Sequence, residues 1–167
     1  MILDQDETNL AQPHELSDKE KDDAMGAYLM MFASLAAGLP LPVINLIASV
    51  IYYFVNRDRS AFVHFHALQS LLSQIPTSLL NAGLVFWTFS NIIEHEGGGD
   101  AQWGEEYLMY LAFVIVMNLL YVVFSLIAAV RARKGRYYYF IVFGKMAFDY
   151  VNGYHKPDSD SVNLPPR

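Results

Sequence analysis

The chain of 167 residues contains no cysteine, which excludes disulfide bonds, metal sites built on thiolates and thiol catalysis. Its long apolar stretches, residues 24–55, 61–93 and 107–130, also contain no Asp, Glu, Lys or Arg. Proton-coupled transporters and ion-driven motors generally need an ionisable group inside the membrane, so both classes are disfavoured. Motifs of serine hydrolases, zinc proteases and phosphate-binding loops are missing as well. We therefore predict a protein that is not an enzyme and that needs no cofactor.

The charge-free stretches are the strongest signal of the fold class. Each of them reaches the length of about 20 residues that a membrane-spanning helix requires. A soluble protein of this size would have too little remaining chain to cover three such helices with polar surface. The sequence predicts an all-α integral membrane protein, with residues 24–151 as its helical membrane domain.

The two ends of the chain are polar. Residues 1–23 carry eight carboxylates and only two lysines, with too few apolar residues for a packed core. They are predicted to form an acidic, disordered cytoplasmic tail, either a spacer or a docking segment, and they do not have the pattern of a signal peptide. Residues 152–167 contain three prolines and are predicted to be a flexible tail.

Charge placement predicts how the later helices are oriented. Residues 131–136 hold four basic residues, whereas residues 94–106 hold five carboxylates and no Lys or Arg. Positive residues beside membrane helices stay on the cytoplasmic side, so the basic segment is predicted inside and the acidic loop outside. Helices at about 64–92 and 107–130 would then form an antiparallel hairpin.

Both charged segments are candidate binding surfaces. The basic segment is interpreted as a topology anchor or, alternatively, as a site that binds anionic lipid headgroups. Its basic residues are Arg131, Arg133, Lys134 and Arg136. The external loop is a candidate for contacts with a protein partner through Glu94, Glu96, Asp100, Trp103, Glu105 and Glu106. Nucleic acid is not an expected partner of so acidic a chain.

Prolines at positions 40 and 42 break the first stretch into pieces at about 24–38 and 42–55. Each piece would be only about 20–25 Å long, short of a hydrocarbon core of about 30 Å. A short helical hairpin is favoured over one kinked helix that places the N-terminus outside. The prediction is thus about four hydrophobic helices with both termini cytoplasmic. Residues 137–151, rich in tyrosine, are predicted to form an interfacial aromatic helix.

Polar residues recur at three- and four-residue spacing along the second stretch and form a stripe on one helix face. They predict either a helix-packing face or the wall of a hydrated path, together with two asparagines on neighbouring stretches. The set is His66, Gln69, Ser70, Ser73, Gln74, Thr77, Asn81, Asn45 and Asn118. His64 and His66 point to nearly opposite sides of a regular helix, so no metal site is expected from them.

The segment SAFVHFHALQSLLSQ resembles a "pFvrFHamQAlllq"-type motif, and LIAAVRARKGRYYYFIVFGKMA resembles the ending "iiAaikAnkGeyyryPlig". Both belong to a family of small bacterial membrane proteins of unknown function, related to the twenty-kilodalton channel-like subunit of the chloroplast inner-envelope import translocon. The matching positions are Phe62, Phe65, His66, Ala67, Gln69, Ala128, Gly135, Tyr137 and Tyr138. Ala61 and Phe140 depart from the family, which often has proline there.

This resemblance covers about residues 24–148 and implies a four-helix, multi-pass membrane module with both ends inside, in a bacterial inner membrane. It also implies a role in protein translocation or in a membrane complex. The leading hypothesis is a non-enzymatic accessory subunit of a larger membrane protein complex, in protein translocation or secretion. Its partners are membrane lipids and other membrane subunits. The alternative is a small homo-oligomeric channel lined by the polar stripe.

Overall fold

The computed structural model describes residues 11–33, 42–100 and 103–155. These residues form five α-helices and one short 3-10 helix, so the prediction of an all-α protein is confirmed. In chain order the elements are α1 (Asp18–Leu29), η2 (Met30–Phe32), α3 (Pro42–Asn56), α4 (Ala61–Glu96), α5 (Glu105–Arg133) and α6 (Phe143–His155).

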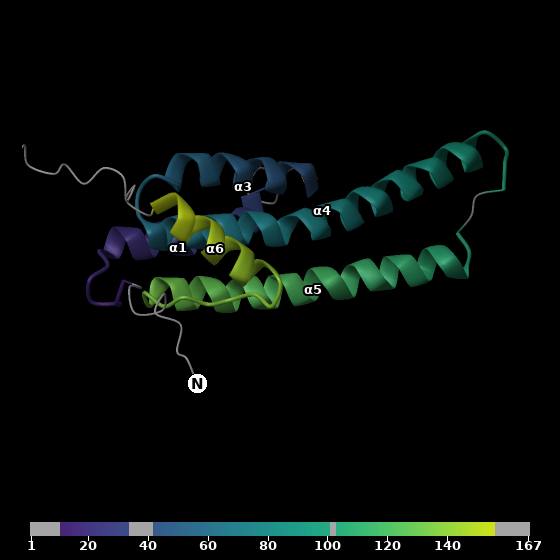
Figure 1. Ribbon diagram of the computed structural model, residues 1–167. Helices are drawn as coiled ribbons and strands as arrows, with labels where there is room; N and C mark the ends of the chain where they lie inside the picture. Colours follow the sequence, from purple (N-terminus) through teal and green to yellow (C-terminus); the bar gives the residue numbers. More distant parts are fainter. Residues whose placement is uncertain (1–10, 34–41, 101–102, 156–167) are drawn as a thin grey trace, which may run out of the picture.

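A long antiparallel hairpin of α4 and α5 forms the axis of the molecule (Figure 1). The remaining helices gather around one half of it, and the other half extends beyond them. Ser60 starts α4 by accepting a hydrogen bond from the backbone N–H of Val63 at 3.4 Å. At the far end, Gly98 adopts a φ of +80°, which favours glycine, in the turn after α4.

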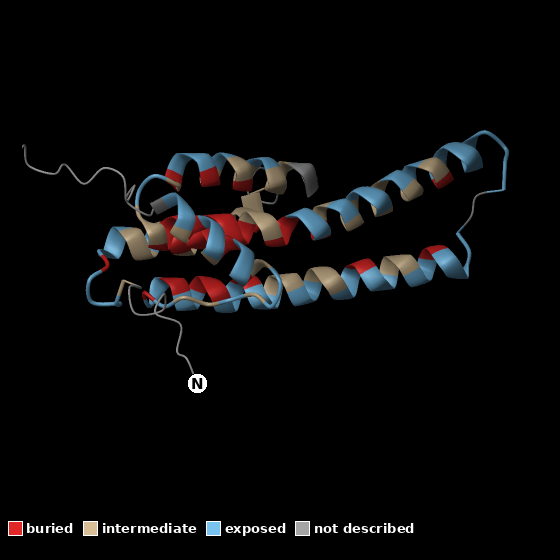
Figure 2. Ribbon diagram, in the orientation of Figure 1, coloured by how far each residue is buried: buried red, intermediate tan, exposed pale blue. Residues whose placement is uncertain are grey.

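Two apolar clusters hold the helices around the hairpin. In the first, α5 presents the small buried residues Ala128, Ala129 and Ala132 to α1, and such residues let helices approach closely. In the second, Phe65 of α4 packs with side chains of α3 and α6. Figure 2 shows that buried residues concentrate in this half of the molecule.

The N-terminal region differs from the predicted disordered tail, because α1 already begins at Asp18. Ser17 accepts a hydrogen bond from the N–H of Glu20, and the Glu20 carboxylate accepts one from the N–H of Ser17 at 2.9 Å. This capping box satisfies backbone donors that otherwise destabilise a helix start. The break between the predicted pieces of the first stretch lies mostly outside the described residues, and α3 begins at Pro42.

Within the described residues, α5 is the one helix that is long and apolar enough to cross a membrane, and Ile44–Asn56 is a shorter apolar helix. The predicted set of four hydrophobic helices is therefore not reproduced. Polar side chains lower the hydropathy of α4, although its 36 residues far exceed the length needed. The described part of the first stretch is divided between short helices.

The segment at residues 137–142, called the strap below, belongs to the stretch that is predicted to form an interfacial aromatic helix. Instead it is non-helical, and α6 begins only at Phe143. The strap runs back along α5 before α6 turns onto α4 (Figure 1). Gly144 lies where the strap meets α6, and its N–H donates to the carbonyl of Phe140 at 2.9 Å.

Two glycines of α6 provide a test of this packing. A Cβ at position 144 would lie 2.8 Å from the backbone Cα of Tyr139, whereas a Cβ at Gly153 meets nothing within 4 Å. We expect Gly144→Ala to lower the free energy of unfolding by about 2 kcal/mol through overpacking. Gly153→Ala should raise it by about 0.5 kcal/mol through helix propensity. Denaturant unfolding of the detergent-solubilised protein measures both values, and equal effects would contradict the close strap contact.

Candidate functional site

The side chain of Gln69 joins three separate parts of the chain. Its Nε2 donates to the hydroxyl of Tyr28 and to the carbonyl of Tyr138, both at 2.8 Å. Its Oε1 accepts from the N–H of Phe140 at 3.2 Å. Gln69 is fully buried, so this amide connects α1, α4 and the strap at the centre of the packed half.

Two of the three histidines of α4, His64 and His66, are also fully buried, and they face different helices. Nδ1 of His66 lies 2.9 Å from the hydroxyl of Tyr28 on α1. Nε2 of His64 lies 3.2 Å from the hydroxyl of Tyr53 on α3, and its ring contacts Tyr154 of α6 edge-on. Each imidazole thus belongs to a different helix contact. Among the described residues, no group of three His, Asp or Glu side chains is placed to hold a metal ion.

Further along the stripe, side chains bond to backbone carbonyls and to α3. Ser70 donates to the carbonyl of Ala27 in α1 at 2.8 Å. Gln74 accepts a hydrogen bond from the hydroxyl of Ser49 in α3. Ser73 and Thr77 donate to carbonyls of their own helix three residues earlier, each at 2.9 Å. The structure therefore places this part of the stripe between helices.

The last members of the stripe form a pair across the hairpin. Asn81 and Asn118 exchange amide hydrogen bonds at 3.0 and 3.1 Å, which fixes the register of α4 against α5. Beside them is a cavity of about 100 Å³, to which Asn45 and Gln74 contribute polar groups. The structure thus brings six of the predicted polar residues into contacts between α4 and its neighbours: His66, Gln69, Ser70, Gln74, Asn81 and Asn118.

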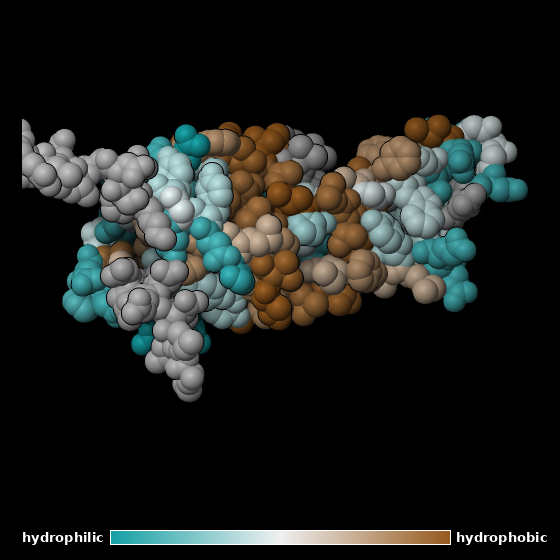
Figure 3. All heavy atoms as spheres, viewed as in Figure 1, coloured by the Kyte–Doolittle hydropathy of each residue, from teal (hydrophilic) through white to brown (hydrophobic). Residues whose placement is uncertain are grey.

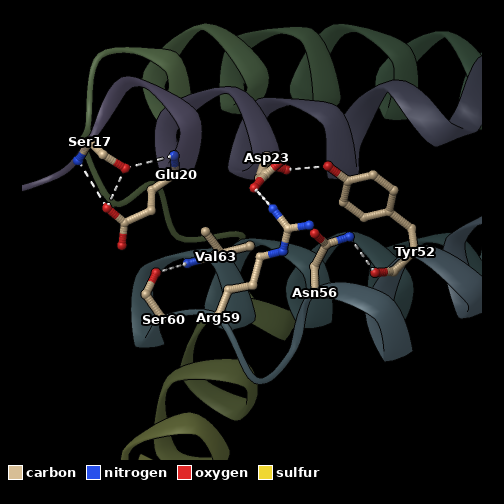
Figure 4. A network of polar contacts seen from close by, with 8 residues as sticks. All are labelled: Ser17, Glu20, Asp23, Tyr52, Asn56, Arg59, Ser60 and Val63. Carbon is tan, nitrogen blue, oxygen red and sulfur yellow. Dashed lines mark hydrogen bonds and ion pairs between the residues drawn. The ribbon is translucent and has the colours of Figure 1, made fainter.

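The basic end of the hairpin is partly neutralised by α1. Arg133 forms an ion pair with Asp22 at 2.9 Å, and Arg59 forms one with Asp23. Figure 4 shows this corner, where Tyr52 also donates to the carbonyl of Asp23 at 2.6 Å. The acidic residues at the start of α1 therefore dock onto arginines of the loop before α4 and the end of α5.

Hydrogen bonds at this end also lower the pKa values of two carboxyl groups. Those from the side chain and backbone of Ser17 lower the pKa of Glu20 below its ordinary value. The hydroxyl of Tyr154 donates to Asp58 at 2.5 Å and lowers the pKa of that carboxyl. Both shifts favour the ionised forms of Glu20 and Asp58.

The acidic loop lies at the opposite tip of the hairpin (Figures 1 and 3). Its predicted residues that the structure describes are all exposed: Glu94, Glu96, Asp100, Trp103, Glu105 and Glu106. The Trp103 ring packs edge-on against Tyr107 at the start of α5, with 5.1 Å between centroids. The carboxylates thus stand at one end of the molecule, and the basic segment stands at the other.

The sequence reasoning missed the tyrosines that complete the network. Tyr28 is fully buried and contacts both His66 and Gln69, yet its position in an apolar stretch gave no sign of a polar role. Ser49 and Tyr52 on α3 were missed for the same reason. The three-residue spacing of Ser49 and Tyr52 on α3 was the available signal, but using it required knowing which helices are neighbours.

Fold and site together define a helical protein with a polar interhelical network, an acidic tip and a base where acidic and basic side chains pair. Residues 21–146 match the model of the magnetosome magnetite crystal formation protein family, MamF/MmsF. This match spans more than half of the chain, and the chain belongs to that family. No curated protein and no solved structure matches it significantly.

The family match shows that the predicted relation to the chloroplast import translocon is wrong. The predicted roles in translocation and secretion rested on that relation and lose their support. The shared motif residues explain how the error arose. Phe65, His66 and Gln69 pack and hydrogen-bond helices together. A short motif with such a structural task is not specific to one function.

The Gln69 network predicts coupled effects of mutation. Gln69→Leu removes the partners of Tyr138 and Phe140, and we expect a loss of about 2 kcal/mol in unfolding free energy. Tyr28→Phe should cost less once Gln69 is already leucine, because the two side chains share a hydrogen bond. As a control, Gln69→Leu and Asn118→Leu should be additive, since these sites share no partner. Additive effects for the Tyr28 pair, measured by the same denaturant titration, would contradict the network.

Proposed function

We propose that this protein is a non-enzymatic, membrane-embedded accessory protein of magnetite crystal formation. In this proposal the α4–α5 hairpin crosses the magnetosome membrane and carries the acidic loop to the side of the crystal. The observation that carries the proposal is the separation of charge along the hairpin. Exposed carboxylates stand at its tip, and the arginine-rich segment stands with both described chain ends at its base.

Exposed apolar side chains support the membrane placement. They form a band across the molecule between hydrophilic ends (Figure 3). Phe86, Ile93 and Leu79 of α4 are 75, 69 and 68 % exposed, and Leu119 of α5 is 61 % exposed. Leaving such a side chain in water forgoes about 1.5–3 kcal/mol relative to burial. A bilayer removes this cost, and α5 at about 43 Å is long enough to cross its core.

Carboxylate chemistry supports a role for the loop at an iron mineral. Carboxylate oxygens bind hard cations and serve as ligands in protein iron sites. The described loop residues do not form a group placed to chelate one ion. We therefore assign the loop a multivalent contact with an iron-rich surface, in which many weak carboxylate interactions add together.

The alternative of a homo-oligomeric channel has less support. A conduit needs polar groups that are available to the solute. The amides of Asn81 and Asn118 are engaged with each other, and Gln69 and Gln74 are engaged with α1, α3 and the strap.

Neutralising the loop tests the proposal. In magnetite-forming cells, Glu94→Gln, Glu96→Gln and Asp100→Asn together should change the size or shape of the crystals, because three of the five mineral-facing carboxylates lose their charge. The amount of protein in the membrane should stay the same, since these side chains are exposed. Electron microscopy of the crystals and quantitative immunoblotting of membranes give the two readouts.

The matched control removes three carboxylates from the other end of the sequence, as Asp4→Asn, Asp6→Asn and Glu7→Gln. This variant should form crystals like those of the wild type. Normal crystals with the loop variant, at normal protein level, would refute the proposed role of the loop. An equal change with both variants would show that the location of the charge is irrelevant, which also refutes it.

A further inference from the structure

Three cations at the base of the hairpin have no carboxylate partner among the described residues. The acidic residues of α1 pair with Arg133, Arg59 and Lys21. The ion pairs of the described chain include none to Arg131, Lys134 or Arg136, all of which are exposed. A local excess of positive charge therefore remains next to the strap.

An apolar cleft is linked to one of these cations, Arg131, through Tyr138. It has a volume of about 370 Å³ and lies between α4, α5 and the strap. Pro76 of α4 and Leu120 and Phe124 of α5 line it, and Tyr138 lines it from the strap. The guanidinium carbon of Arg131 lies 5.9 Å from the centre of the Tyr138 ring. The same tyrosine thus joins the cleft to an unpaired cation.

The cleft lies within the depth of one bilayer leaflet from Arg131. Phe124 and Leu120, which line it on α5, stand seven and eleven residues before Arg131, which corresponds to about 10 and 16 Å along the helix. Half of the hydrocarbon core is about 15 Å deep. Ile141 and Val142 of the strap are apolar and 99 and 61 % exposed, so the strap itself presents apolar surface beside the cleft.

We propose that the cleft binds one anionic phospholipid, with its phosphate against Arg131 and an acyl chain between α4, α5 and the strap. A guanidinium binds phosphate oxygens with two parallel hydrogen bonds. Lys134 and Arg136 add attraction for a headgroup of net negative charge, which selects against zwitterionic lipids. This inference rests on the membrane placement proposed above, and it does not depend on the role of the acidic loop.

Lipid-dependent stability of the purified full-length protein in neutral detergent tests the site. Phosphatidylglycerol should raise the Tm, and phosphatidylcholine with the same acyl chains should raise it much less. Soluble glycerol phosphate should have no effect, because it lacks the chain that fills the cleft. Arg131→Gln should raise the phosphatidylglycerol concentration needed for half of the Tm increase roughly tenfold, as expected for a lost charge-assisted contact. Leu120→Trp fills the cleft and leaves Arg131 in place, and it should also raise this half-maximal concentration.

Arg57→Gln is the matched control, since Arg57 also lies over an aromatic ring, Phe54, at 5.1 Å, but outside the cleft. It should leave the lipid response unchanged. Equal stabilisation by both lipids, or equal loss in the Arg57 and Arg131 variants, would overturn the proposal. Stabilisation by glycerol phosphate alone would overturn it too, since it would indicate a simple anion site. If the Leu120→Trp variant responded to phosphatidylglycerol like the wild type, the proposal that an acyl chain occupies the cleft would be refuted.

Discussion

The buried amide of Gln69 is the constraint on which the rest of the packed half depends. An amide in an apolar interior is costly unless its donors and acceptor are satisfied. Gln69 is satisfied only when α1 brings Tyr28 and the strap brings Tyr138 and Phe140 to it. The same hydrogen bonds keep the strap from continuing as a helix. They hold it along α5, where it forms one wall of the apolar cleft.

A second constraint separates the charges of the molecule. The acidic residues of α1 dock on arginines at the base of the hairpin, so the N-terminal helix belongs to the same end as the basic segment. The loop carboxylates form no ion pair with any described residue and stay exposed at the other end. Because α4 and α5 are longer than a bilayer core requires, the two ends can lie on opposite sides of a membrane. In the function proposed here, one end meets the mineral and the other meets lipid headgroups.

The sequence predicted the helical class and the α4–α5 hairpin because apolar periodicity and charge placement are local signals. It also identified the polar stripe, since three- and four-residue spacing shows which side chains share a helix face. It could not identify the partners of the stripe, because Tyr28, Ser49 and the strap are distant in sequence. The start of α1 was missed, because acidic residues that look solvated in isolation pair with Arg133 and Arg59 once the chain folds. The family was mistaken because a packing motif was read as a functional one.

The central claim is that the hairpin crosses the magnetosome membrane with the acidic loop on the crystal side. The natural chain has no cysteine, so single cysteines introduced as Glu96→Cys and Lys134→Cys report their own accessibility. Intact magnetosomes would be treated with a membrane-impermeant maleimide before and after permeabilisation. The account predicts labelling at position 134 in intact vesicles and labelling at position 96 only after permeabilisation. Labelling of both positions in intact vesicles would contradict it.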